Sequence, residues 1–337
     1  MKPSDFSKCL TTFFTTHLTR TRNLSENTIM SYRDTFRLLL AFCRDECSLP
    51  PEKISFKVLD EKIILRFLEW LQDERSCSIA TRNQRLAAIH SFFRYAQAEE
   101  PGYLLTSQRI MQIPFKKQSR AIIQHLSPEQ TRVLLSQPNV STKIGRRDST
   151  LLSVLYDTGA RVQELCDLLV KDIRFEYPAR MFLAGKGRKV RPVPMLGNTT
   201  DLLESYMKEH GLLENAKQDS PLFFNQRRTK LTRGGVSHIL KRYAEMASQT
   251  NEDFPKAITP HILRHTKAMH LYQAGVNLVY IRDILGHVDI STTDIYARAD
   301  IEAKRKALEN VYSNITPTVD YPDWNRDSNI LEFLKNL

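Results

Sequence analysis

The sequence predicts a mostly α-helical protein of two domains, with a small β-sheet in the second domain. Three observations predict this class. The first third of the 337 residues carries apolar residues at helical spacing, and this pattern breaks between Pro101 and Pro128. Further helical stretches follow the break, but two short apolar runs around a basic turn interrupt them. We therefore expect domains at residues 1–113 and 127–312, a linker at 114–126 and a tail at 313–337.

The first domain contains three amphipathic stretches in chain order. Ser25 is suited to cap the first of them, because a serine hydroxyl accepts a hydrogen bond from the first helical turn. Residues 59–71 form the second stretch and residues 81–98 the third. Their apolar faces predict a shared helical core.

Three arginines occupy the third stretch: Arg82, Arg85 and Arg94. They lie on the side away from Leu86, Ile89 and the two phenylalanines. Singly, each suits an ordinary solvated helix face. Together, on one helix of a basic protein, they could equally contact a DNA backbone.

The linker is basic and poorly periodic, and Lys116 and Lys117 lie near its middle. We expect it to lie on nucleic acid. Pro128 follows Ser127, a pair that predicts an N-cap and the first turn of a new helix.

The second domain alternates helices with one hairpin. A helix should end at Gly159 and another should run to residue 169, followed by two strands near 182–183 and 190–193 joined by a tight turn. Helices are then expected at residues 201–210, 233–246, 260–274 and 278–285. A short apolar stripe at 329–337 predicts a terminal helix, which packs either on its own core or on a neighbouring subunit.

The composition favours a nucleic-acid partner. The chain has 49 Lys and Arg against 38 Asp and Glu, a formal net charge of +11. Such an excess attracts polyanions. The segment from Arg180 to Arg191 holds five basic residues and no acid, and these include Lys186, Arg188 and Lys189.

Other classes are disfavoured. The chain lacks the roughly 20 consecutive apolar residues of a membrane span and a secretory leader, so we expect a cytoplasmic protein with no membrane partner. Its five cysteines lack metal-site spacing and are expected to be reduced thiols. His261 and His265 have the spacing of a zinc protease motif, but Ile262 replaces its glutamate, so no metal is expected.

The segment from His261 to His265 suits a phosphate clamp better. His261, Arg264 and His265 project from one side of the expected helix. Arginine offers a planar fork for phosphate oxygens, and histidine adds a donor. This cluster alone is a weak signal.

Two other segments carry complementary groups. Arg161 should open a helix, with Glu164 one turn later to hold its guanidinium. His287 precedes Tyr296 by nine residues. A tyrosine is a weak nucleophile at its ordinary pKa of about 10. Cationic donors around a target phosphate would make its attack feasible.

These motifs resemble the signature of the tyrosine recombinase (phage integrase) family. The matching segments are TGARVQEL around Arg161, GKGRKVR around Lys186, HILRH at 261–265, LGH at 285–287, and Tyr296. The match spans residues 126–300, in order. Ala160 replaces a larger apolar residue that is commoner in the family. The first third resembles the family's helical, SAM-like core-binding domain less specifically.

The resemblance implies a role for each residue. Tyr296 attacks the DNA phosphate and leaves a 3′-phosphotyrosine and a 5′-hydroxyl. Arg161 and Arg264 hold the non-bridging oxygens, and His261 and His287 add hydrogen bonds. Lys186 protonates the leaving 5′-oxygen. Glu164 and His265 are supporting residues.

The resemblance also implies an assembly. Two domains would form a C-shaped clamp on double-stranded DNA, and a homo-tetramer would exchange strands through a Holliday junction with no ATP, metal or other cofactor. The further basic residues expected at the DNA are Lys116, Lys117, Arg188, Lys189 and Arg191.

Several functions remain open within this class and beside it. Integration, excision or transposition of a mobile element is favoured, and dimer resolution of chromosomes or plasmids is the alternative. A type IB topoisomerase and a catalytically silent DNA-binding regulator are the rivals. The target sequence and any accessory directionality factor are not readable from the chain.

Overall fold

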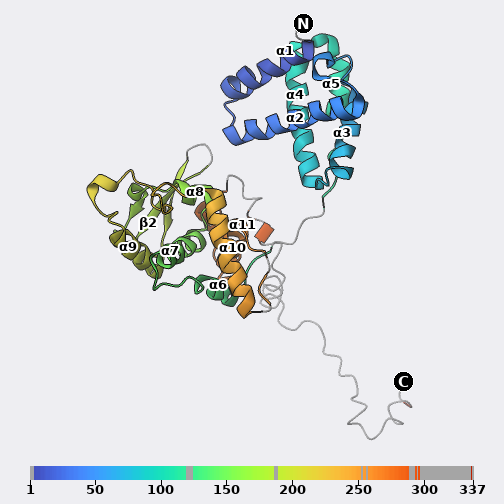
Figure 1. Ribbon diagram of the computed structural model, residues 1–337. Helices are drawn as coiled ribbons and strands as arrows, with labels where there is room; N and C mark the ends of the chain where they lie inside the picture. Colours follow the sequence, from blue (N-terminus) through green and yellow to red (C-terminus); the bar gives the residue numbers. More distant parts are fainter. Residues whose placement is uncertain are drawn as a thin grey trace. The chain divides into compact units, whose positions relative to one another are not determined.

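The computed structural model describes residues 4–118, 124–185, 189–251, 253–255, 257–287, 293, 295, 296 and 335. The chain divides into two compact units, Met1–Ala121 and Ile122–Leu337 (Figure 1). The first unit is helical throughout its regular structure, and the second combines helices with a three-stranded sheet. The predicted fold class is therefore confirmed.

The first unit is built from five α-helices and a π-helix among the residues described. Its core is rich in phenylalanine, and Phe6, Phe13, Phe36 and Phe56 all lie near Phe92 at ring-centroid distances of 5.1–6.0 Å. Aromatic pairs at such distances add to the stabilisation from burial. The elements are α1 (Asp5–Thr12), η1 (Phe13–Thr21), α2 (Glu26–Cys47), α3 (Glu61–Asp73), α4 (Ile79–Glu99) and α5 (Leu104–Met111).

The predicted caps form as expected. The Ser25 hydroxyl accepts from the Thr28 amide at the start of α2, and the Ser127 hydroxyl accepts from the Gln130 amide at the start of the sixth helix. The Gln130 side-chain oxygen in turn accepts from the Ser127 amide, which completes a capping box. The sequence did not predict the π-helix, because a π-helix has no separate apolar period at this length.

The second unit places its helices around a small antiparallel sheet of order β1-β2-β3. Helix α11 packs on α7, α10 and α12. The elements are α6 (Pro128–Leu135), α7 (Lys143–Thr158), α8 (Val162–Asp167), β1 (Ile173–Arg174), β2 (Arg180–Ala184), β3 (Val190–Pro194), α9 (Gly197–Glu209), α10 (Arg233–Thr250), α11 (Pro260–Gln273) and α12 (Leu278–Leu285).

The sheet contains the predicted hairpin and one strand more. Strands β2 and β3 pair with Leu183 opposite Arg191 and Met181 opposite Val193. Strand β1 is only two residues long, too short for a period of two to be visible in the sequence. Along β3, Arg191 and Val193 face the interior while their neighbours are exposed. This alternation decides the environment of Arg191.

The ends of two helices and the state of the cysteines agree with the predictions from the sequence. Gly159 ends α7 in the left-handed region with φ of 58°, and Gly286 ends α12 with φ of 66°. All five cysteines are free. Lys186, Arg188 and, apart from Lys335, the expected terminal helix lie outside the described residues.

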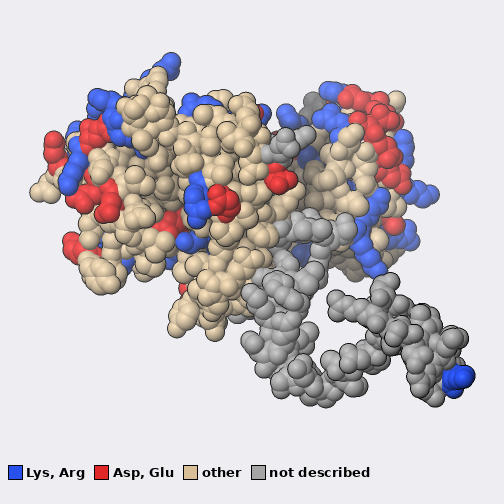
Figure 2. All heavy atoms as spheres, turned by 90° about the horizontal axis from the view of Figure 1, so that it is seen from below, with Lys and Arg blue, Asp and Glu red and all other residues tan. Residues whose placement is uncertain are grey.

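Charges of both signs are interspersed on the surface shown in Figure 2. The basic excess does not form one uninterrupted patch there, so a DNA contact has to be argued residue by residue. Among the described helices, none combines the length and apolar character that a bilayer crossing requires.

Candidate active site

The carboxyl end of α12 lies at the centre of the candidate site. Three successive carbonyl groups there have no partner within the helix, and each accepts a hydrogen bond from a different arginine. Arg191 Nε donates to Ile284 O at 2.8 Å, Arg264 Nη2 to Leu285 O at 2.5 Å, and Arg161 Nη2 to Gly286 O at 3.0 Å. The negative end of a helix dipole suits these cations.

Arg161 begins α8, as the sequence predicted, and Glu164 holds it. The carboxylate accepts from the Arg161 amide and from its Nη1, both at 2.8 Å. The side chain of Arg161 remains 40% exposed, whereas that of Glu164 is 3% exposed. The outer face of the Arg161 guanidinium is therefore free to meet a ligand.

Glu164 also binds a second arginine. Arg191 donates to both carboxylate oxygens, at 2.9 and 2.8 Å. Burial by itself would raise the pKa of Glu164, but the hydrogen bonds from Arg191 and Arg161 outweigh burial and hold this pKa below its usual range. The site keeps a buried carboxylate between two guanidinium groups.

Arg264 is the most deeply buried cation of the group. It is 2% exposed and donates to Gly159 O at 2.6 Å as well as to Leu285 O. Burial lowers its pKa to about 10, with the neighbouring charge of Arg161 acting in the same direction. At neutral pH it is still charged, so it supplies a fixed positive group.

Tyr296 lies beside the second histidine of the HILRH segment. His265 Nδ1 and Tyr296 Oη are 2.7 Å apart, and the ring of His261 packs edge-on against that of His265. Tyr296 is fully buried in a small apolar cluster with Met269 and Ile281 among its members. Burial raises the pKa of Tyr296 to about 12, which the charge of Arg264 partly offsets. The phenol is thus protonated at neutral pH.

The histidines of the site are neutral near pH 7. Burial lowers the pKa of His265 and of His287 to about 4, and nearby positive groups act in the same direction. The pKa of the more exposed His261 is lowered as well, by burial and by Arg264. His287 Nδ1 lies 3.0 Å from the Thr293 hydroxyl.

An open cavity of about 530 Å³ adjoins these groups. Arg161 lines it from the start of α8, His287 from the segment after α12, and Lys189 and Val190 from the start of β3. Lys189 is exposed. The cavity thus presents several cationic or hydrogen-bonding groups to one space, as recognition of a phosphate requires.

Arg191, a predicted DNA contact in the second unit, has little exposed surface. Its side chain is 14% exposed, lines part of the same cavity, and donates three hydrogen bonds to Glu164 and Ile284. It faces inward with Val193 because side chains alternate along a strand. This alternation was readable from the sequence and would have placed Arg191 in the interior.

Arg82, a predicted DNA contact in the first unit, is buried. Arg82 is 4% exposed, and its Nη1 donates to Asn83 and to the carbonyl of Pro114. It lies on the same stripe of α4 as Leu86 and Phe93, so it is part of the packed face. It joins α4 to the chain at residue 114 and has little exposed surface with which to meet DNA.

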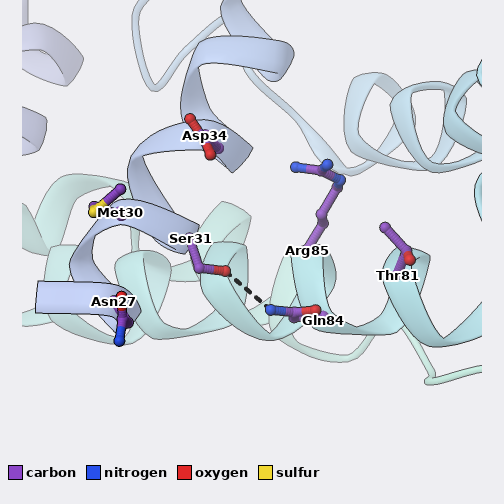
Figure 3. A pocket seen from close by; sticks show the side chains of 7 residues that line it. All are labelled: Asn27, Met30, Ser31, Asp34, Thr81, Gln84 and Arg85. Atoms are coloured by element: carbon purple, nitrogen blue, oxygen red, sulfur yellow. Dashed lines mark hydrogen bonds between the residues drawn. The ribbon is translucent and has the colours of Figure 1, made fainter. Parts of the chain in front are cut away.

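The other two arginines of α4 keep accessible positions. Arg94 is exposed, and Arg85 is half-buried. Arg85 lines a hollow of about 270 Å³ between α2 and α4, together with Asn27, Gln84 and four further residues (Figure 3). In this hollow Gln84 donates to the Ser31 hydroxyl at 3.0 Å.

The two lysines after Pro114 are exposed. The backbone of Lys116 is held by Asn83 of α4, whose amide group donates to Lys116 O and accepts from Lys116 N. Lys116 Nζ donates to Gln72 at 2.6 Å.

Among the described residues, no group of three His, Cys, Asp or Glu is placed to hold a metal ion.

The arrangement of a buried tyrosine beside a cluster of arginines and histidines defines a class of phosphoryl-transfer protein, and comparison with known proteins places the chain within that class. Residues 124–303 match the phage integrase family, and residues 12–100 match its N-terminal SAM-like domain. The chain belongs to the phage integrase family of tyrosine recombinases, whose members are DNA strand transferases.

Individual relatives are similar in sequence to this chain along most of its length. The y4rC protein of Sinorhizobium fredii, provisionally named an integrase or recombinase, is 37% identical and covers all of this chain and 99% of its own. Tyrosine recombinase XerC of Bacillus subtilis is 30% identical over 90% of this chain and 95% of its own.

A solved structure of the XerH recombinase bound to its difH DNA substrate has a TM-score of 0.66 and 25% identity, and the match covers 86% of this chain and 81% of XerH. The Tn1549 transposon integrase, solved with transposon-end DNA, has a TM-score of 0.70 at 20% identity, over 90% of this chain and 99% of that one. At 20% identity, the similarity to the Tn1549 integrase shows a shared fold only.

Glu164→Gln is expected to destabilise the protein by about 3 kcal/mol at pH 7, because it leaves two guanidinium groups without their buried counter-charge. The pKa of Glu164 is lowered in the folded state, so its contribution is present above its unfolded pKa of about 4.3 and is lost as the pH falls through the folded value. Urea unfolding of both proteins at pH 7 and at about pH 3 measures this.

The matched control is Glu204→Gln, which removes a half-exposed helical carboxylate paired with Lys208. Its effect should stay within about 0.5 kcal/mol. An equal loss of stability in the two variants, or a loss for Glu164→Gln that does not shrink in acid, would contradict the prediction.

Proposed function

We propose that the protein is a site-specific DNA recombinase that cuts and rejoins strands through a covalent link between DNA and Tyr296. The observation that carries the proposal is the convergence of Arg161, Arg264 and Tyr296, with their histidines, around the end of α12. Several preorganised cations at one place suit the charge that develops on a phosphate under attack.

The proposed step follows from these positions. Tyr296 Oη attacks the phosphorus atom as the bond to the 5′-oxygen breaks, which gives a 3′-phosphotyrosine. Arg161 and Arg264 stabilise the non-bridging oxygens, while His261 and His287 donate to the phosphate. Lys186, by resemblance to the family, protonates the departing 5′-oxygen. Attack by a 5′-hydroxyl reverses the step and rejoins a strand.

The contact between His265 and Tyr296 gives His265 a more direct role than support of the helix. Its neutral ring lies within hydrogen-bond distance of Oη and can orient the phenol and receive its proton during attack. Because Tyr296 is fully buried, cleavage requires a conformational change that brings Oη to the phosphate.

DNA is the proposed partner of both units. Exposed Arg94, Lys117 and Lys189 suit phosphate contacts. The hollow lined by Asn27, Gln84 and Arg85 offers amide and guanidinium groups of the kind that read base edges. Double-stranded DNA with a defined core site is therefore the proposed substrate, and pairs of sites would be joined in a homo-tetramer.

We propose movement of a mobile element as the biological role. The relative y4rC, which matches along its whole length, carries an integrase or recombinase name, and the fold is shared with a transposon integrase. Resolution of chromosome or plasmid dimers is the alternative role for the same reaction.

A strand-exchange assay tests the proposed reaction. The protein first selects its binding site from a pool of random duplexes. Two duplexes of different length that carry this site are then incubated with the protein, with EDTA and without nucleotide. We expect recombinant duplexes and Holliday junctions on native gels, because the proposed chemistry needs neither metal nor ATP.

The other outcomes identify the rival functions. Relaxation of a supercoiled plasmid without strand exchange would indicate a topoisomerase, and tight binding without cleavage would indicate a silent DNA-binding protein. The genomic distribution of the selected site separates the roles: paired sites that bracket a movable segment support a mobile element, and one site per replicon supports dimer resolution.

A further inference from the structure

The hydrogen bonds of Arg191 to Glu164 and Ile284 indicate a role for this residue within the site. It is the most heavily bonded of the three arginines at the end of α12, with two bonds to Glu164 and one to Ile284. Unlike Arg161, it has little exposed surface from which to touch DNA. Its hydrogen bonds therefore hold other groups of the site in place.

We propose that Arg191 is a positioning residue for strand transfer, which holds the Glu164 carboxylate so that Arg161 presents its guanidinium to the phosphate. This inference rests on the proposed function, because it assigns Arg191 a part in that reaction. It replaces the expectation that Arg191 contacts DNA.

The division of hydrogen bonds on Glu164 supports the proposal. Arg191 forms a two-pronged pair, with Nη1 and Nη2 on different carboxylate oxygens. Arg161 places only Nη1 on the carboxylate and sends Nη2 to Gly286 O. The bidentate pairing geometry is thus already occupied by Arg191. This leaves the outer side of Arg161 uncommitted.

Charge leads to the same conclusion. Glu164 carries one negative charge, and Arg161 and Arg191 carry two positive charges between them, so these three residues have a net charge of +1, to which Arg264 adds a further positive charge. Without Arg191, a buried carboxylate would face Arg161 as its nearest counter-ion, draw it into a closed pair and cancel its charge. The phosphate would then lose an electrostatic partner without losing any residue that touches it.

The surroundings of Arg191 hold it in one place. A Cβ atom on Gly286 would lie 2.7–2.9 Å from three atoms of its guanidinium group, and a Cβ on Gly185 would lie 3.5 Å from Nη1. The absence of a side chain at Gly286 thus makes room for this group, whereas the distance from Gly185 is that of an ordinary van der Waals contact. Its remaining contact, to Ile284 O, fixes it to the same helix end that binds Arg161 and Arg264.

Single-turnover cleavage of a nicked duplex, measured at saturating protein over a range of pH, tests the proposal. We expect Arg191→Met to slow cleavage on the order of tenfold to a hundredfold, as expected when a reacting group is misplaced, with DNA affinity unchanged. Arg191→Lys should restore part of the rate, because one ammonium replaces the charge but not the two-pronged geometry.

The pH profile separates positioning from simple loss of structure. Among the residues that the structure describes, the charged groups that face Glu164 are Arg161, Arg191 and, from α11, Arg264. Removal of Arg191 takes away hydrogen bonds that lower the pKa of Glu164, so this pKa should rise. The acid limb of the cleavage profile should then move to higher pH.

Arg147→Met is the matched control. Arg147 also has a side chain 14% exposed, donates to the buried carboxylate of Asp148 and reaches a backbone carbonyl, that of Phe224. We expect it to lower stability in the same way while leaving the cleavage rate and its pH profile unchanged.

Two results would overturn the inference. One is an Arg191→Met protein with weaker DNA binding but a normal rate at saturation, which would make Arg191 a DNA contact. The other is an unchanged pKa of Glu164 in Arg191→Met, measured by carbon-13 NMR of the carboxyl group. The NMR measurement needs no turnover, so absence of cleavage by the wild-type protein counts against the proposed function alone.

Discussion

Replacing Tyr296 by phenylalanine is expected to abolish covalent attachment of the protein to DNA while DNA binding persists. The substitution removes only the Oη atom, the proposed nucleophile, and keeps the ring in its apolar cluster. His265 loses one hydrogen-bond partner, so the folded state should weaken by only about 1 kcal/mol. Incubation with a nicked duplex followed by a denaturing gel measures the adduct.

Tyr272→Phe is the control for this experiment. Tyr272 packs against the same small cluster and is partly buried. Its variant should form the adduct at the wild-type rate. An adduct that survives in Tyr296→Phe, or that mass spectrometry places on another residue, would refute Tyr296 as the nucleophile.

Arg264→Lys is expected to slow cleavage by about a hundredfold to a thousandfold, the usual cost of losing one preorganised donor at a developing negative charge. Lysine keeps the charge, but a single ammonium group cannot bond both Gly159 O and Leu285 O and also meet a phosphate. The loss should appear in the single-turnover rate at saturating DNA, with a smaller change in affinity.

The same replacement at Arg147, which pairs with buried Asp148 elsewhere in the unit, is the control. Arg147→Lys should reduce stability without slowing cleavage. A rate for Arg264→Lys within threefold of wild type would remove Arg264 from the phosphate site, and circular dichroism of the variant shows whether its fold is intact.

Local sequence signals predicted the elements well because their causes are local. Ser25, Ser127 and Gly159 cap helices through contacts within one turn. The helices around Arg161 and Arg264 likewise follow from spacing and caps. The π-helix and the two-residue strand β1 escaped prediction, since neither has a period that so short a segment can display.

The individual roles of the arginines were harder to predict. Charge suggests exposure, yet Arg82 lies on the packed stripe of α4 and Arg191 on the inner face of β3. Helical and strand periods were sufficient to place both inside. What no period could reveal is the meeting of Glu164 with Arg191, because that contact joins elements 27 residues apart.

The end of α12 has a consequence for regulation. Its last three carbonyl groups tether Arg191, Arg264 and Arg161, and His287 follows directly. A displacement of this one helix end would therefore disturb all three guanidinium groups together. The positions of all three positive groups thus depend on one helix end. We therefore expect any event that shifts α12 to lower the activity of the whole site.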